Sequence, residues 1–201
     1  MNYEYVSENI IICENYLPSS MLDLVKTDLL NNKTNFDLPM WSDNTKNFSE
    51  KCGGLDYWIT NDQPTPPNNE AILGLEKWFY HHGLTSFIKH SGRLNSFQFL
   101  NRQLQHKIHV ISYNHGGYYN WHLDSEHFTF NLVLNEGDEL LGGNMLFMDE
   151  GRIVEVPNQN NLMILMPTYV QHCVTPLRSK TGKEVTFTQQ RFSVQYWVKC
   201  N

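Results

Sequence analysis

The chain is poor in basic residues and in cysteine, and it has no long hydrophobic run. Its 201 residues include 15 Lys and Arg against 21 Asp and Glu, a formal net charge of -6. That balance argues against a nucleic-acid binder. The longest apolar runs, Ile10–Cys13 and Leu162–Met166, are far shorter than the roughly 20 residues of a membrane span. The sequence therefore predicts neither a nucleic-acid partner nor a membrane partner.

The few cysteines stand far apart in the sequence. They are Cys13, Cys52, Cys173 and Cys200, with no CxxC pair among them. This spacing favours reduced thiols over a disulfide framework or a zinc site. The first five residues are acidic and aromatic, with no basic stretch before an apolar one, so no secretory signal is predicted. We expect a cytoplasmic protein.

Apolar spacing predicts two helices in the first half of the chain. Residues 21–29 repeat at helical spacing after Pro18-Ser19-Ser20, which is expected to supply the N-cap, and residues 72–82 form a second repeat. Between them, residues 31–69 are rich in Asn, Asp, Pro and Gly and show no period. A long irregular segment of this kind is either a lid that orders over a substrate or a plain surface loop.

The second half of the chain has the alternating pattern of strands. Residues 107–113, 128–134 and 192–198 alternate, and Gly, Asn and Pro turns separate the runs. Aromatic residues, at 13% of the chain, suit such a core. We predict a single domain over residues 1–201, mostly β with N-terminal helices. Residues 1–95 would be helical support and loops, and residues 96–201 an antiparallel sandwich or barrel.

A candidate metal site lies in the run Tyr119-Asn120-Trp121-His122-Leu123-Asp124. Residues two apart on a strand share a face, so His122 and Asp124 would project side by side. They are two members of a 2-His-1-carboxylate set, the ligands of non-haem Fe(II) oxygenases. The HxD triplet alone is weak evidence. His172, after the apolar run 162–166, is the candidate third ligand, and His127 is its one rival.

A candidate carboxylate clamp opens the last alternating run. Arg191 and Ser193 are two residues apart and would share one strand face. The guanidinium offers a bidentate fork to a carboxylate, and the hydroxyl adds a further hydrogen bond.

Taken together, these segments resemble the Fe(II)/2-oxoglutarate-dependent dioxygenases, and within them the prolyl 4-hydroxylase-like branch. The resemblance implies a double-stranded β-helix, also called a jelly roll, with buttressing helices. The matching pieces span about 85 residues and follow one another in the same order as in the family. The strand and helix expected at residues 10–30 also resemble the N-terminal part of that branch, but less specifically. The matching pieces are Tyr113, the run 119–124, the run 141–147 with Gly142-Gly143, the run 172–176, the run 191–193, and Trp197.

The resemblance also implies roles for particular residues. His122, Asp124 and His172 would hold Fe(II). Arg191, Ser193 and Tyr113 would bind the co-substrate 2-oxoglutarate, and Asn131 is a weaker candidate for the same role. O2 would be the oxidant, with ascorbate as a supporting reductant.

Two departures from the family pattern matter. Arg191 lies 19 residues after His172, whereas the branch usually has about ten, so residues 178–184 are interpreted as an insertion that lengthens a hairpin. Arg178 or Lys183 would then be the alternative clamp, although only Arg191 heads an alternating strand. Val133 stands where some members carry a second Tyr that contacts the co-substrate.

The resemblance predicts hydroxylation of an unactivated C–H bond, most simply in a prolyl residue of a peptide or protein, with release of succinate and CO2. The alternatives are a hydroxylase of a free amino acid or small metabolite, a non-catalytic metal-binding jelly-roll module, and a cupin-like metalloprotein without an organic co-substrate. A nucleic-acid demethylase is disfavoured, because its second Arg would fall where Trp197 stands. The sequence does not reveal the oligomeric state.

Overall fold

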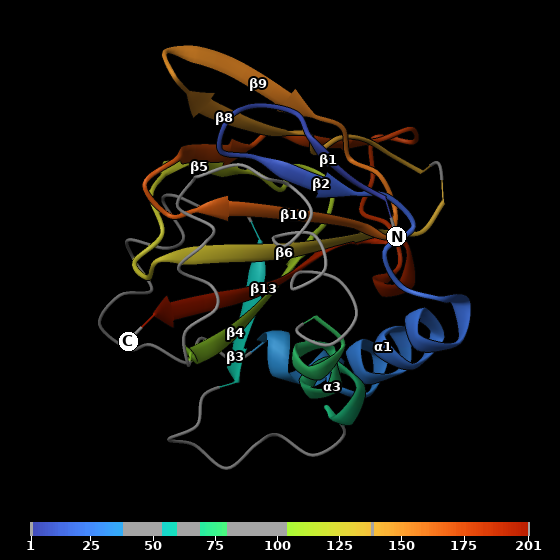
Figure 1. Ribbon diagram of the computed structural model, residues 1–201. Coiled ribbons are helices and arrows are strands. Elements are labelled where there is room, and N and C mark those ends of the chain that lie inside the picture. The colour runs from blue at the N-terminus through green and yellow to red at the C-terminus, as the bar shows by residue number, and fades with distance from the viewer. Residues whose placement is uncertain (1, 38–53, 60–68, 80–103, 138, 201) are drawn as a thin grey trace.

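A seven-stranded antiparallel sheet is the centre of the fold (Figure 1). The computed structural model describes residues 2–37, 54–59, 69–79, 104–137 and 139–200. The strand order is β1-β2-β10-β6-β13-β4-β3. In chain order these strands are β1 Tyr3–Tyr5, β2 Ile11–Cys13, β3 Leu55–Ile59, β4 Leu104–Tyr113, β6 Phe128–Asn135, β10 Leu162–Pro167 and β13 Arg191–Cys200.

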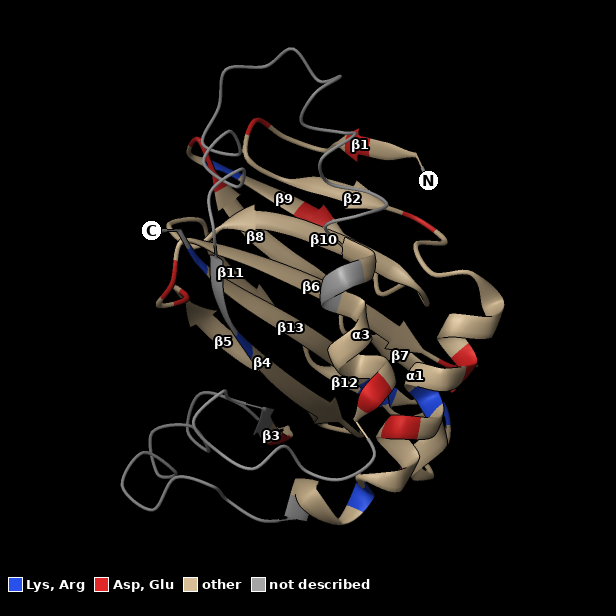
Figure 2. Cartoon of the chain, turned by 60° about the horizontal axis from the view of Figure 1, so that its bottom comes forward, with Lys and Arg blue, Asp and Glu red and all other residues tan. Residues whose placement is uncertain are grey.

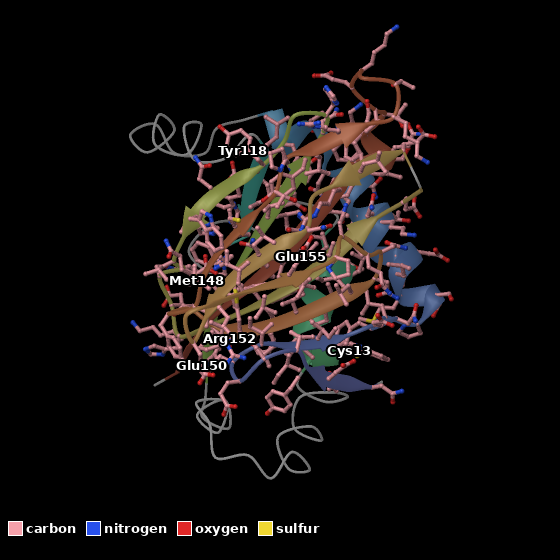
Figure 3. The ribbon with its side chains drawn as sticks, turned by 90° about the horizontal axis from the view of Figure 1, so that it is seen from above. Cys13, Tyr118, Met148, Glu150, Arg152 and Glu155 are labelled. Carbon is pink, nitrogen blue, oxygen red and sulfur yellow. The ribbon has the colours of Figure 1, made fainter. Side chains whose placement is uncertain are left out.

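A smaller sheet faces one side of the large sheet and completes the jelly roll. Its strand order is β5-β11-β8-β9, and a separate pair joins β7 to β12. Figure 3 looks down on this side, with Met148, Arg152 and Glu155 on the hairpin of β8 and β9. The strands are β5 Tyr119–His122, β7 Leu140–Gly142, β8 Met145–Asp149, β9 Arg152–Val156, β11 Gln171–Val174 and β12 Leu177–Ser179.

The helices cover the opposite side of the large sheet (Figures 1 and 2). They are α1 Ser19–Asn31 and α3 Glu70–Phe79, with short 3-10 turns at Lys33–Asp37 and Phe187–Gln189. Buried Asp28 of α1 accepts hydrogen bonds from the amides of Ala71 and Ile72, which satisfies the N-terminus of α3. None of the described helices is long and apolar enough to cross a membrane.

Each central strand has two different faces. On β6 and β13 the residues that face the helices are apolar, and they join one buried cluster with α1 and α3. They are Phe128, Phe130, Leu132 and Leu134, with Phe192, Val194, Tyr196 and Val198. The alternate residues face the smaller sheet, and many of these are polar. They include Thr129, Asn131, Arg191, Ser193 and Gln195, all buried.

The predicted fold class is confirmed, with three corrections. Residues 55–59 form β3, an edge strand of the large sheet, within the segment expected to be irregular. The predicted insertion 178–184 does not form a local hairpin, because its first two residues belong to β12, which pairs with β7. The N-cap of α1 is Pro18, and it makes no side-chain hydrogen bond.

Several predictions fall on residues outside the described ranges. The lid hypothesis rests largely on residues 38–53 and 60–68, and the predicted end of the second helix falls at 80–82. Among the described cysteines, Cys13 and Cys173 are free and buried. The single-domain interpretation stays a prediction.

Candidate metal and co-substrate site

The three predicted metal ligands meet between the two sheets. His122 ends β5, and its direct register partner on β11 is His172. Asp124 follows two residues after His122. The Nε2 atoms of His122 and His172 lie 3.6 Å and 3.7 Å from the carboxylate oxygens of Asp124. One ligand atom from each residue lies within 4.8 Å of the others, and this is the one such group in the described part of the chain.

Backbone carbonyls orient both imidazoles. His122 Nδ1 bonds the carbonyl of Asn120 at 2.8 Å, and His172 Nδ1 bonds the carbonyl of Val170 at 3.1 Å. A carbonyl can only accept, so the hydrogen of each ring is on Nδ1 and the lone pair is on Nε2. This is the arrangement that a metal-ligating histidine needs.

The ligand atoms themselves are buried and lack hydrogen-bond partners within the described ranges. They are Nε2 of His122, Nε2 of His172 and Oδ1 of Asp124. The other carboxylate oxygen, Asp124 Oδ2, accepts from the hydroxyl of Thr129. Burying three such atoms is unfavourable unless something pairs with them. Two imidazole nitrogens and a carboxylate suit Fe(II), so the residues present fit the iron that the predicted family uses.

Burial sets the protonation of these ligands. It lowers the pKa of His122 to about 4, with a further contribution from His172, and it lowers the pKa of His172 to about 4. Burial also raises the pKa of Asp124. Both imidazoles are therefore neutral near pH 7, as ligation requires. The Tyr119 ring stacks on His122 at 3.8 Å between centroids and supports that ring from one side.

The predicted clamp residues lie together on the inner face of the large sheet. Arg191 has no solvent exposure, and its register partner on β4 is Tyr113. Arg191 Nη1 donates to Ser193 Oγ at 2.9 Å, and the guanidinium carbon lies 5.0 Å from the Tyr113 ring centroid. The alternatives are placed differently, because both Arg178 and Lys183 are exposed. The geometry favours Arg191.

Asn131 lies on the same inner face and is 1% exposed. Its Nδ2 donates to Met145 Sδ at 3.0 Å, and its Oδ1 is buried with no hydrogen-bond partner among the described residues. Val133, at the position of the family's second Tyr, packs in the apolar cluster of the barrel interior. The rival ligand His127 is exposed and is not part of the metal group.

The sequence reasoning missed a second polar pair in the barrel. His109 of β4 is 1% exposed, and its Nε2 lies 2.8 Å from Asp56 Oδ2 of β3. The His109 ring also lies edge-on to Trp197, at 5.7 Å between centroids. Alternation in β4 places His109 on the face of Tyr113. Asp56, however, falls in a stretch without a readable period.

Comparison with known proteins agrees with this site. Residues 108–199 match the sequence model of the 2OG-Fe(II) oxygenase superfamily. That range contains the three metal ligands and the clamp. A search of curated protein sequences gave no match.

Solved structures with the same fold include a Pseudomonas putida prolyl-4-hydroxylase, with a TM-score of 0.62, 18% identity and coverage of 96% of this chain and 93% of that one. A Trichoplax adhaerens prolyl hydroxylase, in complex with a hypoxia inducible factor peptide fragment, has a TM-score of 0.68, 20% identity and coverage of 96% and 84%. IDO from Bacillus thuringiensis has a TM-score of 0.58, 14% identity and coverage of 96% and 91%.

At these identities the structural matches establish the fold. The resemblance seen in the sequence is confirmed: residues 108–199, which hold most of the jelly-roll core, match the 2OG-Fe(II) oxygenase superfamily, and the fold is shared with prolyl 4-hydroxylases. This family uses Fe(II), 2-oxoglutarate and O2, and the His-Asp-His group fits the iron.

Proposed function

We propose that this protein is an Fe(II)- and 2-oxoglutarate-dependent dioxygenase that hydroxylates an unactivated C–H bond, most simply in a prolyl residue of a peptide or protein. One observation carries the proposal. A buried His-Asp-His group and a buried Arg-Ser pair occupy the same barrel interior, on facing sheets. A metal-binding module without a co-substrate would need only the His-Asp-His group and would not need the buried Arg-Ser pair.

Each residue has a defined part in this proposal. His122, Asp124 and His172 would hold the iron, since two imidazoles and one carboxylate are the ligand set of non-haem Fe(II) oxygenases. Arg191 and Ser193, with Tyr113, bind the distal carboxylate of 2-oxoglutarate, for which the guanidinium is a bidentate donor. Asn131 contributes to the wall between clamp and metal. When bound, Fe(II) and 2-oxoglutarate supply the oxidation, which yields succinate, CO2 and a hydroxylated product.

The barrel controls what reaches the metal. The apolar residues of the interior exclude water from the site, which strengthens the electrostatic hold on the co-substrate. The stack of Tyr119 on His122 limits rotation of that ligand. Ascorbate would be a supporting reductant.

Two substrate classes are considered. A prolyl residue is the first candidate, because the fold is shared with the Pseudomonas and Trichoplax prolyl hydroxylases. A free amino acid or small metabolite is the second candidate, because the barrel carries buried polar groups in addition to the ligands and the clamp.

The first test is an anaerobic titration of metal-free protein with Fe(II) and then 2-oxoglutarate, followed by visible absorption. A chelated 2-oxo acid on Fe(II) gives a charge-transfer band without any substrate. We expect the band in the wild type, its loss in His122→Ala and its weakening in Arg191→Ala. Arg178→Ala is the matched control and should behave as the wild type.

Three other outcomes separate the alternatives. Iron binding without the band would favour a cupin-like site. Equal weakening of the band in Arg178→Ala and Arg191→Ala would remove the clamp assignment. Failure to bind any metal would leave a barrel used for recognition. If the band forms, succinate release with proline-containing peptides tests the substrate class.

A further inference from the structure

Two lysines lie at the end of the large sheet that is opposite to the clamp. Lys107 of β4 is the register partner of Trp197 on β13, just as Tyr113 is the partner of Arg191. Residues an even number apart on a strand share a face, so Lys107 is on the inner face with Tyr113, and Lys199 is on that face with Arg191. Both lysines are exposed. In Figure 2 the start of β4 and the end of β13 lie side by side at one end of the sheet.

The metal group is at this same end of the barrel. Trp197 has Lys107 as its partner on one side and Thr129 of β6 on the other, and Thr129 donates to the metal ligand Asp124. Two strand spacings, about 10 Å, therefore separate the backbones of Lys107 and Thr129. Because the lysine ammonium is on a long flexible stem, it can contact a molecule that is bound over the metal group.

The lysines are too far from the clamp to bind the same carboxylate. Arg191 and Trp197 are six residues apart, or about 20 Å along an extended strand. In the proposed function both carboxylates of 2-oxoglutarate are already used, one at the clamp and the other at the metal. Cations at the opposite end are therefore available to a different molecule, the one that is oxidised.

The end with the lysines has a carboxylate as its present partner. Lys107 Nζ lies 3.0 Å from Glu126 Oε1, and the two side chains are 52% and 15% exposed. An exposed ion pair of this kind contributes little free energy, so another carboxylate can displace Glu126.

The second lysine leaves this end with an excess of positive charge. Lys199 makes no ion pair with any residue that the structure describes. Diagonal neighbours on adjacent strands are about 7–8 Å apart, so Lys107 and Lys199 can contact one carboxylate together. The chain as a whole has a net charge of -6, so these cations are not a consequence of its composition.

We propose that Lys107 and Lys199 bind a carboxylate of the primary substrate, near the carbon that is hydroxylated, and that Glu126 pairs with Lys107 until the substrate displaces it. Two sources supply this chemistry. One is the carboxylate of the oxidised residue itself, in a free amino acid or at a chain end, and the other is an acidic residue beside it in a peptide. This inference rests on the proposed function and narrows its substrate class to acids.

The test compares acidic and neutral probes in two matched pairs. N-acetyl-L-proline and its primary amide differ in the carboxylate of the proline, and acetyl-Ala-Pro-Glu-amide and acetyl-Ala-Pro-Gln-amide differ in the neighbouring residue. Each is added anaerobically to the protein with Fe(II) and 2-oxoglutarate bound, and calorimetry gives the Kd. We expect the acidic member of at least one pair to bind about fivefold more tightly or better. Added NaCl should reduce this preference, because salt screens exposed charges.

Four variants test whether these residues are responsible. Lys107→Gln and Lys199→Gln should each weaken the acidic probe about threefold to tenfold and change the neutral probe by less than about twofold. Glu126→Gln should have the opposite sign and tighten the acidic probe about twofold or more, because it removes a competing carboxylate. Lys26→Gln is the matched control, since Lys26 of α1 also pairs with a glutamate. The Kd of 2-oxoglutarate should stay within about threefold in all four.

The outcomes separate this inference from the proposed function. Absence of the visible band with Fe(II) and 2-oxoglutarate would refute the oxygenase itself. A normal band, with acidic probes that bind no better than neutral ones or do not bind, would refute the lysine site alone. Equal effects of Lys107→Gln and Lys26→Gln would also refute it. A loss of 2-oxoglutarate binding as large as in Arg191→Ala would assign the lysines to the co-substrate. A preference confined to one pair of probes identifies the source of the carboxylate.

Discussion

The two faces of β6 and β13 perform different tasks with alternate residues of the same strands. The face toward the helices is continuous apolar surface, and its residues pack with α1 and α3. The face toward the smaller sheet carries Thr129, Asn131, Arg191, Ser193 and Gln195, all buried. Apolar burial favours folding, whereas buried polar groups oppose it unless they are paired. Apolar packing on the helix-facing side thus stabilises the barrel and offsets the unfavourable burial of polar groups on the other side.

The comparison predicts that mutations inside the barrel, on either sheet, change function, whereas mutations on the helix-facing side of the large sheet change stability. The largest effect is expected for His172→Ala, which removes one of three ligands. Fe(II) affinity should fall by at least roughly a thousandfold, because few ligands share the binding free energy. Competition with a metal-sensitive dye measures the affinity. Unfolding of the metal-free protein by urea should change little, and an equal loss of stability would contradict the division of tasks.

Phe130→Ala should lower stability and leave the binding of ligands largely unchanged. Phe130 is 1% exposed and lies 3.8 Å, between ring centroids, from Phe79 of α3. Its truncation should lower the free energy of unfolding by about 3–5 kcal/mol. Urea denaturation measures this. The fraction that remains folded should bind 2-oxoglutarate with nearly the wild-type Kd, and a specific binding defect would show that the two faces are coupled.

Arg191→Gln tests the clamp on the inner face. Loss of charged hydrogen bonds should raise the Kd of 2-oxoglutarate roughly tenfold to a hundredfold, about 1.5–3 kcal/mol. Calorimetry with Fe(II)-loaded protein gives the value. Lys183→Gln changes an exposed cation and should leave the Kd within about twofold; a comparable loss in that variant would reassign the clamp.

Thr129→Val tests whether the hydrogen bond that supports the metal ligand Asp124 contributes to metal affinity. The change keeps the shape of the side chain and removes the hydroxyl that donates to Asp124 Oδ2. Supporting hydrogen bonds of this kind are worth about tenfold or more in metal affinity. The dye competition should show that loss in Thr129→Val, whereas Thr27→Val on α1 serves as the control. Unchanged affinity would make the Asp124 contact incidental.

The smallest expected effect is the pH dependence of the metal-free protein. The folded pKa of about 4 for His122 and for His172 lies below the ordinary value of 6.5, so the unfolded chain binds more protons between these limits. Stability should therefore rise with pH from about 4 to 6.5. The raised pKa of Asp124 opposes this in part. Urea denaturation at several pH values should show a smaller slope for His172→Gln, and an unchanged slope would contradict the assignment.

Short-range patterns in the sequence were sufficient for much of this structure. Alternation in residues 107–113, 128–134 and 192–198 predicted three strands, and helical spacing predicted α1 and α3. The HxD spacing predicted two neighbouring ligands, since residues two apart share a strand face. These features depend on the chain within a few residues, where spacing and side-chain direction are linked.

The features that were missed depend on pairing between distant residues. β3 carries Asp56 into the barrel only because it pairs with β4, and the sequence around it has no period to reveal this. β12 pairs with β7 across some 35 residues, so the insertion does not form the hairpin that was inferred from the long spacing between His172 and Arg191. Register is fixed by the surfaces that must be buried together, and one local stretch does not contain them.

The sequence alone determined the kind of chemistry. It showed which residues could hold iron, which could hold a carboxylate, and that these motifs occur in the same order as in the family. Only the tertiary structure decided which of them meet. It set His172 opposite His122, buried Arg191 while leaving Arg178 exposed, and placed His109 beside Gln195 and Asn131. The reason is physical, because a ligand set or a carboxylate clamp is made by strands that come together only when their apolar faces are buried.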